Sequence, residues 1–228
     1  LPWKQRLPVL MDYFRNDPQL KDILITGGDA LMNTDASLTR VLDAVVSMAR
    51  GKREDNRTRP QGERYQELIR VRLGTRIPVY IPQRVTPALC DILRGFRDRA
   101  AAAGVVQFFI QTHFESAMEL TDDTVRAIRR LQETGWIITN QHVFTAASSR
   151  RGHGARLRQA LGELGVLPYY TFSVKGFMEN RHLYATAARL VQEAREEKCF
   201  GAVHPDRPGL LPFPATDRSI VNLPAVGK

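Results

Sequence analysis

The chain has 228 residues, of which 43% are hydrophobic and 25% are charged, a balance that excludes disordered and collagen-like chains. Lysine and arginine number 33 against 24 acidic residues, and the formal net charge of +9 is compatible with nucleic acid, anionic cofactors or a basic surface. The two cysteines, Cys90 and Cys199, form no CxxC pair, which excludes a disulfide framework, a zinc knuckle and a cysteine-ligated iron-sulfur cluster within this sequence.

Neither a membrane segment nor a signal peptide is visible. No apolar run approaches the roughly 20 residues that a bilayer crossing needs, and the N-terminal LPWKQRLPVL lacks the plan of a secretory signal. We therefore expect a cytoplasmic protein without a membrane partner.

Short apolar runs alternate with amphipathic segments along the chain. Strands are predicted at 22–26, 68–73, 105–111, 136–139, 166–172 and 219–222. Helices are predicted from Asp35, from Thr86-Pro87, from Thr121 to Gly135, around Leu157 to Leu164, and over about 183–198. Strands that alternate with helices imply right-handed crossovers and a parallel sheet, so the predicted class is α/β.

Much of the positive charge lies between Arg50 and Arg64, where six basic residues outnumber three acidic ones and no apolar residue occurs. This composition predicts a solvated polar loop inserted at residues 50–65. Because no aromatic side chain is available there for stacking on bases, we do not expect nucleic acid as a partner.

Polar residues follow the end of each predicted strand. They stand at 26–29, 72–76, 111–113, 140–142 and 173–175. Periodicity alone leaves an open doubly wound sheet and part of a barrel both possible. Because strand ends converge on one mouth in a barrel, where such folds place their chemistry, we favour a partial barrel forming a single domain over residues 1–228.

Several blocks together resemble the lysine 2,3-aminomutase family of radical S-adenosylmethionine enzymes. In chain order they are Asp22 to Leu31 (DILITGGDAL), Gly74 to Pro87, Thr112 to Phe114, Asn140-Gln141, Pro168 to Tyr170 and Leu223 to Lys228. The resemblance covers essentially the whole chain and matches the middle and later parts of the family's barrel. It implies a partial (β/α) TIM-like barrel of the radical SAM type.

The resemblance also assigns cofactor-binding residues. Gly27, Gly28 and Asp29 resemble the element that holds the methionyl ammonium of S-adenosylmethionine, with Asp29 as an acceptor. Lys228 resembles the catalytic lysine that binds pyridoxal 5'-phosphate covalently, Gln141 a residue that helps to bind the cofactor phosphate, and His113 a residue facing both cofactors. Taken alone, the glycine pair is common turn chemistry, a histidine such as His113 is more often packed or hydrogen-bonded than catalytic, and Lys228 is a solvated charge.

One motif of the family is absent. Its CxxxCxxC sequence, which ligates the [4Fe-4S] cluster, lies upstream of the block that resembles residues 1–31, so no metal ligand is assigned here. We expect the printed chain to be part of a longer protein, inactive alone, whose complete form is a homo-oligomeric isomerase that needs an external one-electron reductant.

Two positions indicate the substrate. Lysine-specific members place aspartates at the positions of Lys175 and close to Asn222, where they bind the distal ammonium of lysine. A cation and a neutral amide instead favour a γ-carboxylate, so the resemblance implies a glutamate 2,3-aminomutase that moves the amino group from the α to the β carbon. Two alternatives are a lysine 2,3-aminomutase and a catalytically silent barrel fragment or basic binding module.

Overall fold

The computed structural model describes residues 3–174, 178–186 and 188–192. These residues form two compact units. The first lies within Leu1–Thr112 and Asp122–Thr139, and the second within His113–Thr121 and Asn140–Lys228. The single domain expected over residues 1–228 stays a prediction.

In the described part of the chain, five strands form one sheet in the order β1-β2-β3-β4-β5. They are β1 (Asp22–Ile25), β2 (Arg70–Gly74), β3 (Gln107–Thr112), β4 (Ile137–Phe144) and β5 (Leu167–Ser173). Val71 pairs with Ile23 on one side and Phe108 on the other, and both pairings are parallel. The predicted α/β class is confirmed, and sequential parallel strands with intervening helices agree with a partial (β/α) barrel.

The described helices of the first unit are α1 (Trp3–Asn16), α2 (Asp35–Thr58), α3 (Ile77–Tyr80), α4 (Pro87–Ala102) and α5 (Asp122–Glu133). Of these, α2, α4 and α5 begin near the predicted positions, whereas α1 and α3 were not predicted. Thr34 caps α2 and Thr86 caps α4, because each hydroxyl accepts a hydrogen bond from the backbone N–H three residues later. None of the helices in the described part of the chain combines the length and apolar character that a membrane crossing requires.

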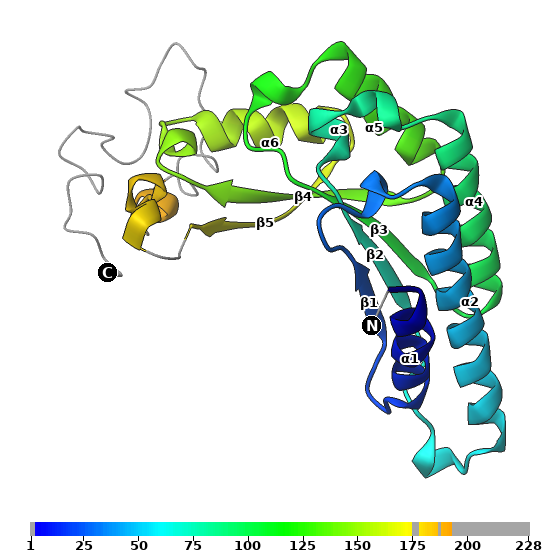
Figure 1. Cartoon of the computed structure of the whole chain (residues 1–228). Helices are drawn as coiled ribbons and strands as arrows, with labels where there is room; N and C mark the ends of the chain where they lie inside the picture. Colours follow the sequence, from blue (N-terminus) through cyan, green and yellow to red (C-terminus); the bar gives the residue numbers. More distant parts are fainter. Residues whose placement is uncertain (1–2, 175–177, 187, 193–228) are drawn as a thin grey trace. The chain divides into compact units, whose positions relative to one another are not determined.

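The core of the first unit lies between its strands and helices. Figure 1 shows α2 and α4 side by side along one side of β1, β2 and β3. The rings of Phe96, Phe108 and Trp136 meet there with centroids 5.5 to 6.2 Å apart, and the indole N–H of Trp136 donates to the carbonyl of Leu93. Burying large aromatic rings against each other stabilises the packing of α4 on the sheet.

The prediction of a polar loop at residues 50–65 is wrong for residues 50–58, because α2 continues to Thr58. Lys52 lies on this extension, and its side chain is completely buried. The Nζ atom donates to the carbonyls of Phe14, Asp17 and Leu20 at 3.2, 2.6 and 3.2 Å. Three donors thus meet three acceptors at the end of α1, where helix carbonyls otherwise lack partners.

One helical turn further along α2, Asn56 acts in the same way. Its side-chain amide donates to the carbonyl of Tyr65 at 2.8 Å and its oxygen accepts from the N–H of Tyr65 at 2.9 Å. Polar side chains therefore hold this segment against the rest of the unit. A short 3-10 turn, η2 (Gln61–Glu63), follows the helix.

The second unit contains the end of β4, β5 and helix α6 (His153–Glu163). Shorter 3-10 turns are η4 (Ala117–Glu119), η5 (Ala147–Ser149) and η6 (Met178–Leu183). Of the helix predicted over about 183–198, residues 188–192 are helical, and the strand predicted at 219–222 lies outside the described residues.

Candidate functional site

The loop after β1 has a backbone that only glycine adopts readily. Gly27 and Gly28 have φ values of 102° and 71°, in the left-handed region. No atom lies within 4 Å of the place where a Cβ on either residue would stand. The main chain of this loop is therefore open to close approach by a ligand.

Asp29 ties this loop to the end of β2. One carboxylate oxygen accepts from the N–H of Leu31 at 2.9 Å and from the hydroxyl of Thr75 at 2.7 Å. The other accepts from the N–H of Arg76 at 2.6 Å. Three donors within the chain already engage the carboxylate, so its geometry indicates that it shapes the loop; its predicted contact with a ligand ammonium stays a prediction.

Two predicted residues, His113 and Gln141, lie together in the second unit. His113 directly follows β3, Gln141 lies on β4, and the Nε2 atom of His113 is 3.0 Å from the Oε1 atom of Gln141. The amide nitrogen of Gln141 is 3.5 Å from the hydroxyl of Tyr170. The His113 side chain is 28% exposed, so the pair presents polar groups at the surface, His113 just after β3 and Gln141 within β4.

Aromatic side chains of β5 lie beside this pair. The ring of Phe172 is 6.4 Å from that of His113, measured between centroids. Tyr169 and Tyr170 are 44% and 51% exposed, and their ring centroids are 4.4 Å apart. Both tyrosines are thus available at the surface of the described residues.

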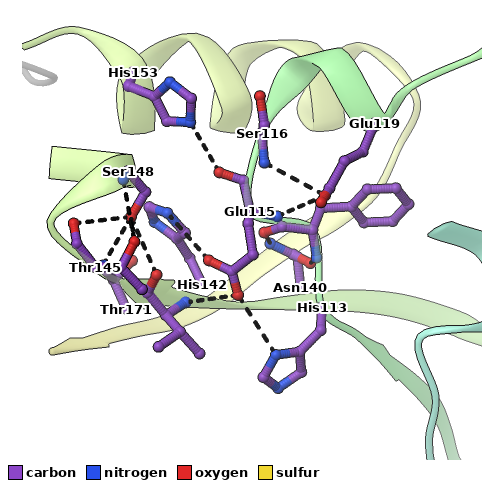
Figure 2. A network of polar contacts seen from close by, with 12 residues as sticks. His113, Glu115, Ser116, Glu119, Asn140, His142, Thr145, Ser148, His153 and Thr171 are labelled. Atoms are coloured by element: carbon purple, nitrogen blue, oxygen red, sulfur yellow. Dashed lines mark hydrogen bonds and ion pairs between the residues drawn. The ribbon is translucent and has the colours of Figure 1, made fainter. Parts of the chain in front are cut away.

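Glu115, which the sequence did not single out, is the centre of a polar network (Figure 2). One carboxylate oxygen is 3.7 Å from the Nδ1 atom of His113, and the other is 3.8 Å from the Nε2 atom of His142. The carbonyl of Glu115 lies 2.9 Å from the Nε2 atom of His153. One carboxylate therefore lies between the histidine of the predicted site and a second histidine on β4.

His142 is buried and electrically neutral at pH 7. Only 2% of the residue is exposed, and neither ring nitrogen has a hydrogen-bond partner among the described residues. Burial, followed by the positive fields of Arg158, His153 and His113, lowers the pKa of His142 to about 4. Its separation of 3.8 Å from Glu115 is too long for a hydrogen bond.

Asn140, two residues earlier on β4, is bonded on both sides of its amide. Its oxygen accepts from the N–H of Phe114 at 2.7 Å, and its nitrogen donates to the carbonyl of Phe114 at 3.1 Å. This double contact fixes the backbone between His113 and Glu115. The sequence indicated His113 and Asn140 by their positions after predicted strands. The contacts between the two segments depend on the fold.

Three predicted residues, Lys175, Asn222 and Lys228, lie outside the described residues, and so does Cys199. Within the described ranges, no group of three or more His, Cys, Asp or Glu side chains is placed to hold a metal ion. Cys90 is buried in α4, and burial raises the pKa of its thiol, so it does not resemble a cluster ligand.

The residues that are described fit the groups that the resemblance implies. The open main chain at Gly27 and Gly28 admits a small polar ligand, and the side chains of His113 and Gln141 offer groups that hydrogen-bond an anion. Gly27 and Gly28 belong to the first unit, and His113 and Gln141 belong to the second.

Comparison with known proteins identifies relatives, although no family model matches the chain. An uncharacterised KamA family protein of Methanocaldococcus jannaschii is 32% identical over 227 residues, which is 100% of this chain and 31% of the relative. An L-lysine 2,3-aminomutase of Methanococcus maripaludis is 28% identical over 75% of this chain and 34% of the relative. A glutamate 2,3-aminomutase of Clostridioides difficile is 30% identical over 75% of this chain and 35% of the relative.

The chain thus spans about a third of the length of the curated relatives it matches. The match to the KamA protein extends over the full length of this chain, and the observed strand order agrees with the barrel that the resemblance implies. The chain belongs to the lysine 2,3-aminomutase (KamA) family.

Proposed function

We propose that the complete protein is an isomerase that moves the amino group of L-glutamate from the α to the β carbon. Relatives named as lysine and glutamate 2,3-aminomutases support the reaction type. The proposal includes S-adenosylmethionine, pyridoxal 5'-phosphate and a [4Fe-4S] cluster as cofactors, with the cluster ligands outside these 228 residues. It also includes a cytoplasmic location, a homo-oligomeric state and an external one-electron reductant.

The observation that carries the proposal is the contact of 3.0 Å between His113 and Gln141, two residues that the resemblance assigns to one cofactor region. Gln141 would donate to the phosphate of pyridoxal phosphate, and His113 would fix the orientation of that amide through its Nε2 atom. Gly27 and Gly28 would offer main-chain carbonyls to the ammonium of S-adenosylmethionine, while Asp29 holds their loop in place. When bound, the two cofactors would supply a carbon radical and a π-system that delocalises the unpaired electron.

The choice of glutamate depends on Lys175 and Asn222. If both face the substrate, the ammonium of Lys175 pairs with the γ-carboxylate and the amide of Asn222 donates to it. A lysine substrate would meet Lys175 as a like charge, which destabilises the complex in a partly dry site.

Lysine is the second candidate substrate, because several of the matched relatives are named L-lysine 2,3-aminomutase. The first test incubates the complete protein anaerobically with both cofactors, a reconstituted cluster and dithionite, and offers glutamate and lysine separately. We expect β-glutamate as the main product by chromatography. β-Lysine as the main product would favour the second candidate, and absence of both β-amino acids would favour a silent barrel or binding module.

The second test concerns Lys228. Borohydride reduction of the protein with bound pyridoxal phosphate, followed by peptide mapping, should place the label on Lys228. A label on another lysine would overturn this assignment.

A further inference from the structure

The loop after β1 lies beside the end of β2, and both belong to the first unit. Gly74, the last residue of β2, leaves room for this approach, because a Cβ on it would stand 3.1 Å from the Oγ1 atom of Thr26. Thr26 directly precedes the open main chain at Gly27 and Gly28. The residues at the end of β2 are therefore placed to shape the loop that we assign to the ammonium of S-adenosylmethionine.

Thr75, which follows Gly74, is held in one position by the main chain around it. Its N–H donates to the carbonyl of Gln111 on β3 at 3.0 Å, and its hydroxyl oxygen accepts from the N–H of Ile77 at 3.1 Å. Only 5% of the residue is exposed. Because the hydroxyl oxygen accepts from Ile77, its own hydrogen is left to donate to another group.

The hydroxyl of Thr75 donates to the Oδ1 atom of Asp29 at 2.7 Å. An ionised carboxylate only accepts hydrogen bonds, so the direction of this bond is fixed. Ile77, Thr75 and Asp29 thus form a chain of hydrogen bonds in which each bond polarises the next. A hydrogen bond to a charged acceptor is about twice as strong as one between neutral groups, so the carboxylate is firmly held.

The other contacts of Asp29 come from the main chain. The N–H of Leu31 donates to Oδ1 at 2.9 Å, and the N–H of Arg76 donates to Oδ2 at 2.6 Å. Among the described residues, Thr75 is the one side chain that donates to this carboxylate. A substitution at Thr75 therefore weakens the link between the loop and β2 without changing either main chain.

We propose that Thr75 is a positioning residue for the binding of S-adenosylmethionine. Its hydroxyl holds Asp29, and Asp29 holds the loop so that the main-chain carbonyls at Gly27 and Gly28 meet the ammonium. This inference rests on the proposed function, because the ligand is the cofactor assigned there. It differs from a direct role of Asp29, in which the carboxylate itself accepts from the ammonium.

The two roles predict different effects of Thr75→Val, which keeps the shape of the side chain and removes the hydroxyl. If Thr75 positions the loop, the binding-competent conformation of the loop becomes less populated and binding weakens. If Asp29 accepts directly from the ammonium, the loss of one donor leaves its charge more available, and binding stays equal or tightens.

The test measures the dissociation constant of S-adenosylmethionine by anaerobic equilibrium dialysis, with the complete protein and its reconstituted cluster. We expect Thr75→Val to raise this constant by about fivefold or more, and Thr75→Ser, which restores the hydroxyl, to stay within about twofold of the wild type. The content of pyridoxal phosphate, measured by absorbance, should be the same in all three proteins, because His113 and Gln141 belong to the other unit.

Thr134→Val is the matched control for the loss of a buried hydroxyl. Thr134 is completely buried in the same unit, and its hydroxyl donates to the carbonyl of Leu131 at 2.6 Å. It precedes β4, whereas the loop follows β1, so the two lie at opposite edges of a parallel sheet. The control should lower the free energy of unfolding, as Thr75→Val does, but leave the dissociation constant of S-adenosylmethionine within about twofold of the wild type.

A second measurement on the unmodified protein does not depend on whether a variant folds. Hydrogen exchange of the N–H groups of Leu31 and Arg76 is followed by mass spectrometry with and without S-adenosylmethionine. We expect their protection to stay equal or to rise on binding, because Asp29 keeps both donors. Faster exchange in the complex would show that the carboxylate leaves these donors for the ammonium, and it would overturn the inference.

The binding results separate this inference from the proposed function. Equal binding by the wild type and Thr75→Val would overturn the inference alone, and so would equal weakening by Thr75→Val and Thr134→Val. Weaker binding that Thr75→Ser does not restore would also count against the hydroxyl. Absence of S-adenosylmethionine binding by the wild type would contradict the proposed function and the inference together.

Discussion

Two buried basic side chains, Lys52 in the first unit and His142 in the second, differ in their hydrogen bonding. Lys52 is fully buried yet donates to three backbone carbonyls, whereas His142 is 2% exposed and makes no hydrogen bond among the described residues. Burial lowers the pKa of both groups. The difference teaches that burial of a basic side chain fixes its pKa direction but not its hydrogen bonding: Lys52 closes a structural junction, whereas the ring nitrogens of His142 stay enclosed without a partner among the described residues.

The largest effect should come from Lys52→Met. The substitution keeps a long apolar stem but leaves the carbonyls of Phe14, Asp17 and Leu20 without their donor. We expect the free energy of unfolding to fall by roughly 3 kcal/mol or more, measured by urea denaturation. Lys21→Met, at an exposed lysine of the same unit, should change it by less than about 0.5 kcal/mol. Equal stabilities of the two variants would show that the three hydrogen bonds contribute nothing.

Asn140→Leu should have the next largest effect. Asn140 neighbours His142 on β4 but resembles Lys52, because both ends of its amide are bonded to Phe114. Loss of these bonds leaves a buried N–H and carbonyl unpaired, so we expect a loss of about 2 kcal/mol in the same assay. Asn180→Leu, at an exposed position of the second unit, is the control. If Asn140→Leu left the free energy of unfolding unchanged, the two hydrogen bonds to Phe114 would contribute nothing to stability.

His142→Gln should behave differently, with an effect that depends on pH. The pKa of His142 in the folded protein is about 4, below the ordinary value of 6.5, so the unfolded chain binds more protons between these values. The wild type should therefore lose stability as the pH falls from 6.5 towards 4, by about 2 kcal/mol at pH 5, and the variant should lack this component. Chemical denaturation of both proteins at pH 7.5 and 5 measures it. Parallel losses in the two proteins would show that His142 is not the titrating group.

The strands and most helices of the described residues could be predicted because their apolar residues recur with a clear period. Thr86 at the start of α4 and Gly135 after α5 mark boundaries that the structure confirms. The end of α2 was missed because its packing is polar. Lys52 and Asn56, four residues apart on one helix face, satisfy backbone groups that a search for apolar periodicity does not consider.

The candidate site was only partly accessible from the sequence. His113 and Gln141 were named from the resemblance and lie in contact, although their roles are untested. Glu115 was missed, because no local pattern indicates that His113 and His142 lie beside its carboxylate and His153 beside its backbone carbonyl. Such a cluster depends on how distant segments fold together.

The most direct measurement for the central claim is the ratio of kcat/KM for glutamate to kcat/KM for lysine. It should be taken for the complete enzyme and for the Lys175→Asp, Asn222→Asp double variant. We predict that the wild type prefers glutamate and that the double variant shifts the ratio towards lysine by a factor of about 30 or more, which corresponds to the loss of a partly buried ion pair. A wild type that prefers lysine, or a ratio unchanged by the substitutions, would contradict the assignment of glutamate as the substrate.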